Sequence, residues 1–138
     1  MRRHKSLRTR IEERIARKRK DSVFLTREFG DLGGERQVLR ALSDLVHDKK
    51  LVRLGYGVYG RAITSRLSGE ALLYHPTGLR GAAREALDKL GVAWEPTDAE
   101  RAYNERRSTQ VPVNPVLKVK GRFSRRLHDG NRELVLVR

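Results

Sequence analysis

The sequence predicts an α+β fold, and three observations lead to this class. Apolar residues recur at helical spacing in three early segments, with short polar or glycine-containing stretches between them. A glycine-punctuated run of β-branched and aromatic residues follows the third segment directly. Near the C-terminus, short strand-like runs alternate with turn residues.

The first predicted helix covers residues 6–19. Leu7, Ile11 and Ile15 recur every four residues, and Ser6 can cap the start of the helix through its hydroxyl oxygen. Arginine and lysine occupy most of the other positions. The segment therefore predicts an amphipathic helix with one apolar stripe and basic remaining faces.

Two more helices follow in close succession. Thr26 begins a short helix that runs through Phe29 and ends near Gly30, and Gly33 with Gly34 supplies a turn. The third helix begins at Glu35 and ends around residues 48–50. One buried face is predicted for it by the spacing of Val38, Leu39, Leu42, Leu45 and Val46.

Residues 51–60, LVRLGYGVYG, predict a tight two-stranded ribbon. Helix, short helix, glycine turn, longer helix and ribbon is the order of a winged helix-turn-helix. We therefore expect such a domain at residues 1–62, followed by a connection at 63–78, in which Pro76 and Gly78 break regular structure.

Residues 79–138 predict a small α/β unit with a C-terminal antiparallel β-meander. A helix runs from Leu79 to Leu90, where Gly91 stops it. Thr97 and Glu100 match a capping box that opens a helix through about residue 105. Strands are expected at 116–120, 123–127 and 132–137, with an Asp-Gly turn at 129–130 before the last.

The chain is strongly basic, and its charge is polarised. The 138 residues carry a formal net charge of +14. Residues 1–20 hold 10 basic and 2 acidic side chains, residues 21–100 hold 11 and 12, and residues 101–138 hold 10 and 3. Such a distribution favours a nucleic-acid partner. A membrane surface is disfavoured, because the first segment offers no apolar face beyond Leu7, Ile11 and Ile15.

Several classes of function find no support in the residues. The absence of cysteine excludes disulfides and thiolate chemistry, and the four histidines are dispersed along the chain. No run of about 18 apolar residues occurs, and no glycine-rich loop of phosphate-binding form precedes a helix. We expect a cytoplasmic protein that is not an enzyme and uses neither a metal nor a cofactor.

The polar side of the third helix is the predicted site for double-stranded DNA. Arginine can pair with guanine and glutamine with adenine when the second helix of a helix-turn-helix enters the major groove. The ribbon would lie beside the backbone or minor groove, and the first helix would supply phosphate contacts. We expect bases to be read by Arg36, Gln37 and Arg40, the ribbon to contribute Arg53, Tyr56, Tyr59 and Arg61, and phosphates to be held by Arg17, Lys18 and Lys20.

Alternatives remain open at this point. The polar helix face would also suit a solvated surface, and the basic cluster at Lys118, Lys120, Arg122, Arg125 and Arg126 would suit an RNA-binding or ribosome-associated module. A protein-interaction adaptor that meets an acidic partner is a third class. The run Ser108-Thr109-Gln110-Val111-Pro112 has no assigned role.

The chain resembles the AbiEi-type antitoxins of type IV toxin-antitoxin systems. The resemblance is carried by Val23-Phe24, residues 29–33 and 37–45, the LVRLGYGVYG stretch, Tyr103-Asn104 and residues 108–112. It implies a bacterial winged-helix repressor of its own operon, with Gln37, Arg40, Tyr56 and Tyr59 at family positions. It also implies a functional link to a nucleotidyltransferase-like toxin without a stable complex. A homodimer on an inverted repeat would fit such a repressor.

Overall fold

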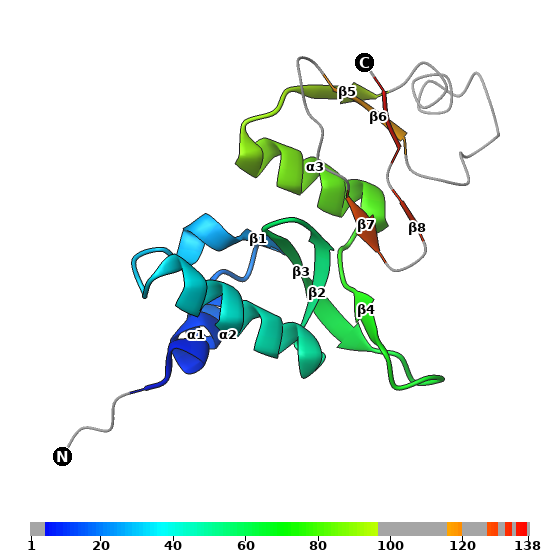
Figure 1. Cartoon of the computed structure of the whole chain (residues 1–138). Helices are drawn as coiled ribbons and strands as arrows, with labels where there is room; N and C mark the ends of the chain where they lie inside the picture. Colours follow the sequence, from blue (N-terminus) through cyan, green and yellow to red (C-terminus); the bar gives the residue numbers. More distant parts are fainter. Residues whose placement is uncertain (1–4, 97–115, 120–126, 130–131, 134, 138) are drawn as a thin grey trace.

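The structure is a computed structural model, and it describes residues 5–96, 116–119, 127–129, 132–133 and 135–137. Helices and small sheets alternate along the chain, so the α+β class is confirmed (Figure 1). The elements are α1 (Leu7–Arg17), β1 (Val23–Leu25), the 3-10 helix η1 (Thr26–Phe29), α2 (Glu35–His47), β2 (Leu51–Gly55), β3 (Val58–Thr64), β4 (Ala71–Leu73), α3 (Gly78–Leu90), β5 (Trp94–Pro96), β6 (Val116–Val119), β7 (His128–Asp129), β8 (Arg132–Glu133) and β9 (Val135–Val137).

The three α-helices lie where the sequence predicts them, although α1 ends at Arg17 and not at the predicted residue 19. The Ser6 hydroxyl accepts a hydrogen bond from the Thr9 backbone N–H at 3.1 Å, which confirms Ser6 as the N-cap of α1. Helix α2 starts at Glu35, as predicted, after the Gly33-Gly34 turn. Helix α3 ends at Gly91, whose φ of 74° is the left-handed conformation that glycine adopts most easily.

The N-terminal sheet has the strand order β1-β3-β2, with both neighbours antiparallel to β3. Strand β4 also pairs with β3, and the backbone of Arg61 donates to Ser22 and accepts from Tyr74. Strands β1 and β4 therefore lie end to end along one side of β3. The range 63–78, predicted as a connection, contains the end of β3 and the whole of β4.

The predicted ribbon is present as the β2–β3 hairpin. Tyr56 and Gly57 form its turn, and the register shifts between Arg53 and Gly55. Gly57 has a φ of 68°, a conformation that is strained for residues with a Cβ atom. The turn therefore depends on the glycine at this position.

The C-terminal strands do not form the predicted antiparallel meander. Strand β5 runs antiparallel to β6, but β9 pairs with β6 in parallel, with Leu117 opposite Leu136. Parallel pairing needs a connection of about a dozen or more residues, and residues 120–134, which include the antiparallel pair β7–β8, lie between these strands. The predicted helix from Thr97 and most of the strand predicted at 123–127 lie outside the described residues.

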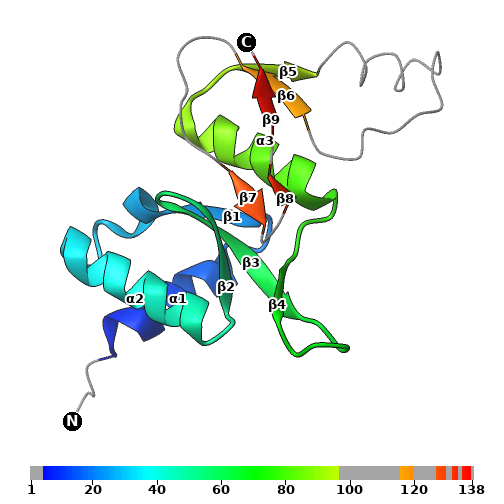
Figure 2. The same cartoon turned by 45° about the vertical axis from the view of Figure 1, so that its right-hand side comes forward.

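Two buried clusters flank the N-terminal sheet. The first joins α1, η1 and α2 to the sheet through Ile11, Phe24, Phe29, Leu42 and Tyr59, among others. The second joins the other face of the sheet to α3 and to β6. Figures 1 and 2 accordingly show α3 between the N-terminal sheet and the pair β5–β6. Strand β3 is thus covered on both faces, and Val58, Tyr59 and Gly60 are buried in succession.

Candidate nucleic-acid interface

Helix α2 has one buried and one exposed side. Val38, Leu42 and Leu45 are at most 1% exposed and hold the helix against the first cluster. Arg36, Gln37 and Arg40, which were predicted to read bases, are all exposed on the other side. The rest of the described chain therefore leaves the outward side of this helix accessible.

The side chain of Gln37 has a local partner. Its Oε1 accepts a hydrogen bond from the Gly34 backbone N–H at 3.4 Å, across the first turn of α2. This contact satisfies one of the backbone donors that a helix start leaves without an intrahelical partner. Gln37 is accessible, but it would have to give up this contact to form a two-point bond with a base.

Two of the predicted ribbon residues lie on the surface. Tyr56 is 68% exposed at the turn. Arg53 is exposed on β2, where its Nε donates to the Gly55 carbonyl at 3.4 Å. The turn and the neighbouring strand thus present an aromatic ring and a guanidinium group close to the first turns of α2, since Tyr56, Gly57, Val38 and Leu39 line one pocket.

The structure corrects the expectation for Tyr59 and Arg61. Tyr59 is 5% exposed and packs in the first cluster, so its ring is not available to a duplex. Arg61 donates to the backbone carbonyls of Ile15, Lys18 and Asp21 at 2.9, 2.6 and 2.6 Å, and its guanidinium lies 5.1 Å from the centre of the Phe24 ring. It satisfies carbonyls at and beyond the C-terminal end of α1, where a helix lacks internal donors.

The basic residues of the first segment divide into two groups. Arg8, Arg14 and Lys18 form ion pairs with Asp48, Asp31 and Glu28. Lys18, expected to hold phosphate, is half-buried, and its Nζ lies 2.8 Å from Glu28 Oε1. By contrast, the second group is exposed and forms no ion pair with any other described residue; it consists of Arg17, Arg19 and Lys20.

Arg14 ties α1 to the segment that precedes α2. Its guanidinium bonds both carboxylate oxygens of Asp31, and its Nη1 also reaches the Glu28 carbonyl at 2.9 Å. The hydrogen bond from Arg14 is the main reason why the pKa of Asp31 is lowered from 3.8 to about 2. The pair fixes the loop from which α2 starts.

We expect the Arg14–Asp31 pair to make stability depend on pH in the acid range. Because its pKa is lower in the folded protein, Asp31 binds a proton more readily after unfolding, so its contribution is complete above about pH 4 and is lost as the pH falls toward 2. Between about pH 4 and pH 2, the midpoint of urea denaturation should therefore fall less in Asp31→Asn than in the wild type. Asp44→Asn, which removes an exposed carboxylate without an ion pair in the described part, should leave the decline unchanged; equal curves for both variants would refute the assignment.

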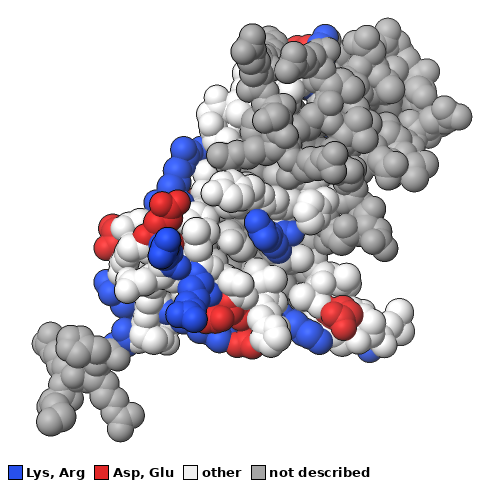
Figure 3. All heavy atoms as spheres, viewed as in Figure 1, with Lys and Arg blue, Asp and Glu red and all other residues white. Residues whose placement is uncertain are grey.

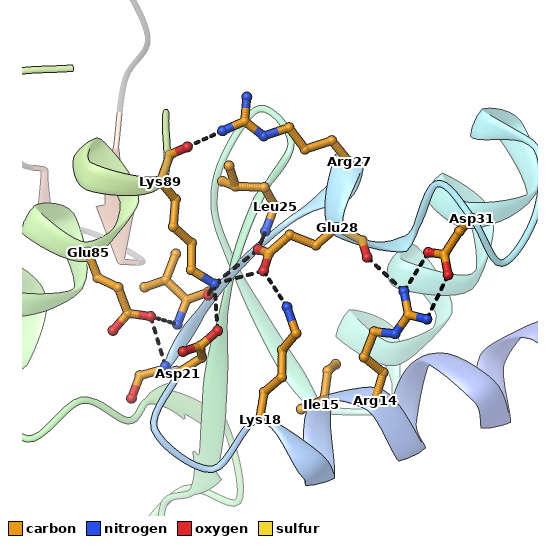
Figure 4. Close-up of polar contacts among 12 residues, drawn as sticks. Arg14, Ile15, Lys18, Asp21, Leu25, Arg27, Glu28, Asp31, Glu85 and Lys89 are labelled. Atoms are coloured by element: carbon orange, nitrogen blue, oxygen red, sulfur yellow. Dashed lines mark hydrogen bonds and ion pairs between the residues drawn. The ribbon is translucent and has the colours of Figure 1, made fainter. Parts of the chain in front are cut away.

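A partly buried polar cluster fastens α3 to η1, β1 and the end of α1 (Figure 4). Lys89 Nζ lies 2.9 Å from Glu28 Oε1, 3.0 Å from Asp21 Oδ2 and 2.6 Å from the Val23 carbonyl. Burial raises the pKa of Glu28, but hydrogen bonds from Lys18, the Leu25 backbone and Lys89 outweigh it, and the net shift is downward. The cluster keeps Glu28 ionised between two lysines.

Glu85 forms a second connection between α3 and β1. Its Oε2 accepts hydrogen bonds from the backbone N–H groups of Ser22 and Val23 at 2.8 and 2.6 Å. Its Oε1 lies 3.3 Å from His75 Nε2. A side chain of α3 therefore satisfies the backbone donors of Ser22 and of Val23, the first residue of β1, and this fixes the start of the strand against that helix.

Basic and acidic side chains mix on the face that Figure 3 shows. Lysine and arginine gather over the region that α2 occupies in the same view of Figure 1, with acidic groups between them. Two acidic residues, Glu35 and Asp44, are exposed on α2. The helix surface thus combines positive groups with carboxylates. Carboxylates repel DNA phosphates unless they accept from a cytosine amino group or pair with arginine.

A pocket of about 430 Å³ opens beside this surface. It lies between η1, the first turns of α2, the turn of the β2–β3 hairpin and the end of α3. Among the residues that the structure describes, no group of His, Asp and Glu side chains is arranged to hold a metal ion, and no helix has the length and apolar character needed to cross a membrane.

These features define a small basic α+β protein with an exposed polar helix face beside a tight hairpin. The chain belongs to the family of unknown function DUF6088, whose profile matches residues 10–138. Comparisons with curated proteins and with solved structures found no match. The family match covers both the α2 surface and the C-terminal strands.

Proposed function

We propose that this protein is a sequence-specific double-stranded DNA-binding protein that represses transcription. The observation that carries the proposal is the accessible side of α2, on which Arg36 and Arg40 are exposed while the opposite side is anchored in the core. Arginine at such positions can form two-point contacts with guanine in the major groove.

The arrangement around α2 supports the proposal. The order α1, β1, η1, α2, β2, β3 and the strand order β1-β3-β2 suit a winged helix-turn-helix in which η1 is the first helix of the motif. Tyr56, at the hairpin turn, lines a pocket with Glu35 and Leu39 of α2. A duplex that receives α2 in its major groove would therefore meet the hairpin turn at the neighbouring backbone.

We assign separate roles to two groups of side chains. Arg36 and Arg40 read bases, with Gln37 available if its capping contact is released. Arg53 and Tyr56 contact the backbone near the hairpin, and Arg17, Arg19 and Lys20 hold phosphates. Tyr59, Arg61 and Lys18 have no part in this interface, because each is used within the fold.

Selection from random DNA duplexes tests the proposal. The purified full chain is incubated with a randomised duplex pool at physiological salt, and bound duplexes are amplified and sequenced. We expect enrichment of one site, and an inverted repeat would indicate two copies per site. Structured RNA serves as competitor: if it displaces the protein from the enriched duplex more effectively than that duplex itself, the RNA-binding alternative replaces the proposal.

Replacing Arg17 and Lys20 by Ala together should weaken binding to all duplexes alike. Each lost phosphate contact lowers the slope of log K against log salt by about 1, so the double variant should show a slope reduced by about 2. Fluorescence anisotropy over a salt series measures both quantities. Arg66→Ala, in the β3–β4 turn, removes one positive charge away from the proposed contacts and should leave the slope unchanged. A slope lowered by about 1 in this control would show that charge alone, not position, is responsible.

We further propose that the repressed operon is the protein's own and that the protein acts as an antitoxin, as its resemblance to AbiEi-type antitoxins implies. A reporter fused to the native promoter should be repressed by the protein and released by Arg36→Ala/Arg40→Ala. Expression of a nucleotidyltransferase-like toxin encoded beside it should arrest growth unless this chain is co-expressed. Arrest that persists on co-expression would remove the antitoxin role and leave repression to be judged by the reporter.

A further inference from the structure

The pocket beside α2 has the size and character of a small-molecule site. Its volume of about 430 Å³ falls within the range of about 300–1,000 Å³ that is usual for ligand pockets. Apolar side chains from three elements line it, namely Leu25, Val38, Leu39 and Leu90. An apolar group placed there would be removed from water on several sides, which is the main source of affinity for small ligands.

The polar groups of the pocket are few. The Thr26 hydroxyl oxygen lies at the pocket wall, and the Tyr59 side chain is within hydrogen-bond reach of it. Because a hydroxyl donates one hydrogen bond and can accept two, Thr26 can bond a polar group of a ligand in addition to Tyr59. The pocket is thus apolar with a small number of polar contacts, the composition that orients a ligand.

Two charged residues of opposite sign also line the pocket. Arg27 comes from η1, and its guanidinium is held by a hydrogen bond to the Lys89 carbonyl, as Figure 4 shows. Glu35 comes from the first turn of α2 and forms no ion pair with another described residue. A cationic ligand would be attracted by Glu35 and repelled by Arg27. An anionic ligand would be attracted by Arg27 and repelled by Glu35. A ligand with both charges satisfies both residues.

We propose that this pocket binds a small zwitterion with an apolar side chain, of the class of α-amino acids. The ammonium group pairs with Glu35, the carboxylate with Arg27, and the apolar side chain lies against Leu39 and Leu90. Thr26 supplies an additional hydrogen bond.

The position of the pocket gives such a ligand a regulatory effect. Its walls include Tyr56 and Gly57 of the hairpin turn and Glu35 of α2, the two elements that our proposed function places on DNA. A ligand bound between them favours one spacing of the hairpin turn and α2. It changes the affinity of the protein for DNA only to the extent that it binds the DNA-bound protein and the DNA-free protein with different affinities. This part of the inference rests on the proposed function, whereas the binding itself does not.

Titration of the isotopically labelled full chain, followed by amide NMR shifts, tests the binding. The probes share one ring: L-phenylalanine, phenethylamine, which lacks the carboxylate, and 3-phenylpropionate, which lacks the ammonium group. We expect saturable shifts at Thr26, Glu35 and Gly57 with L-phenylalanine, and about 10-fold weaker binding of each single-charge probe, as one lost ion pair of about 1.4 kcal/mol implies. Equal affinities for the three probes, absence of saturable shifts, or shifts confined to other elements would overturn the site.

Variants assign the two charges. Glu35→Gln should bring L-phenylalanine down to the affinity of 3-phenylpropionate, and Arg27→Gln should bring it down to that of phenethylamine. Arg27→Lys, which keeps the charge, should retain most of the preference for the zwitterion even if Arg27→Gln loosens α3. Leu39→Trp fills the pocket and should abolish binding of all three probes, and unchanged binding would place the ligand elsewhere. Arg66→Ala should bind as the wild type does.

The regulatory part is tested on the duplex that selection enriches. Saturating L-phenylalanine should change the affinity of the wild type for this duplex at least about 5-fold, which is the lower end of the usual coupling between two sites. It should leave the affinity of Leu39→Trp unchanged. NMR binding without a change in DNA affinity would overturn the coupling alone. If no duplex is enriched, the proposed function and the coupling fall together, and the NMR titration still decides whether the pocket binds a zwitterion.

Discussion

Arg40→Ala is expected to remove most of the sequence preference of this protein while leaving much of its general affinity for DNA. Arg40 is exposed on α2, and its replacement leaves the buried side of the helix intact. A two-point contact between arginine and guanine contributes about 1–3 kcal/mol of discrimination, or roughly 5- to 150-fold. Competition between the enriched duplex and a scrambled duplex, measured by anisotropy, gives this ratio directly.

Two controls separate base reading from charge. Arg17→Ala removes an exposed arginine of α1 and should lower affinity for both duplexes by the same factor. Arg40→Lys keeps the positive charge without the planar fork and should lose discrimination nearly as Arg40→Ala does. If Arg40→Ala and Arg17→Ala reduced binding to both duplexes equally, Arg40 would be a phosphate contact and not a base contact.

Lys89→Met is expected to destabilise the protein strongly, because this α3 side chain is partly buried and contacts two carboxylates and a backbone carbonyl. The side chain of Lys89 is 20% exposed and that of Glu28 is 16% exposed, so removal of the lysine leaves a largely buried carboxylate with one partner fewer. Removing one member of a buried pair typically destabilises by about 3–5 kcal/mol. Because Lys18 still neutralises Glu28, we expect a loss of about 2–3 kcal/mol in the free energy of unfolding, measured by urea denaturation.

Matched variants test the origin of this loss. Lys50→Met removes an exposed lysine that forms no ion pair with another described residue, and it should change stability by less than about 0.5 kcal/mol. Lys89→Met combined with Glu28→Gln should be less destabilising than the sum of the single changes, because the unpaired charge is gone. Additive effects, or a Lys89→Met loss no larger than that of Lys50→Met, would show that the cluster does not hold α3 in place.

The helices could be predicted because their signals are local. Ser6, the Gly33-Gly34 turn and Gly91 mark helix ends by their own backbone and capping chemistry, and apolar spacing marks the buried sides. Strands β1 and β4 each have three residues, too short for an alternating pattern to show. The parallel pairing of β6 with β9 depends on which distant strands meet, and no short stretch of sequence encodes that choice.

The site residues were separated only by tertiary contacts. Lys18 and Arg17 are neighbours in a basic run, yet one faces Glu28 and the other faces solvent. Tyr59 and Arg61 have the same parity along β3, so alternation alone would have placed them on one face, but only the packing of α1 and α2 shows that this face is inward. Arg27 lies on η1, outside the predicted recognition helix, and was not predicted as a site residue because its importance comes from a pocket formed by four elements.

Amide NMR shifts of the full chain on addition of the enriched duplex show which surface of the protein binds DNA. We expect the largest changes at Arg36, Arg40 and Tyr56, on the exposed side of α2 and at the hairpin turn. Little change is expected at Lys118, whose Nζ pairs with Glu95 at 3.3 Å on the C-terminal sheet. Changes concentrated on β5 and β6, with α2 and the hairpin turn unaffected, would contradict the proposed interface.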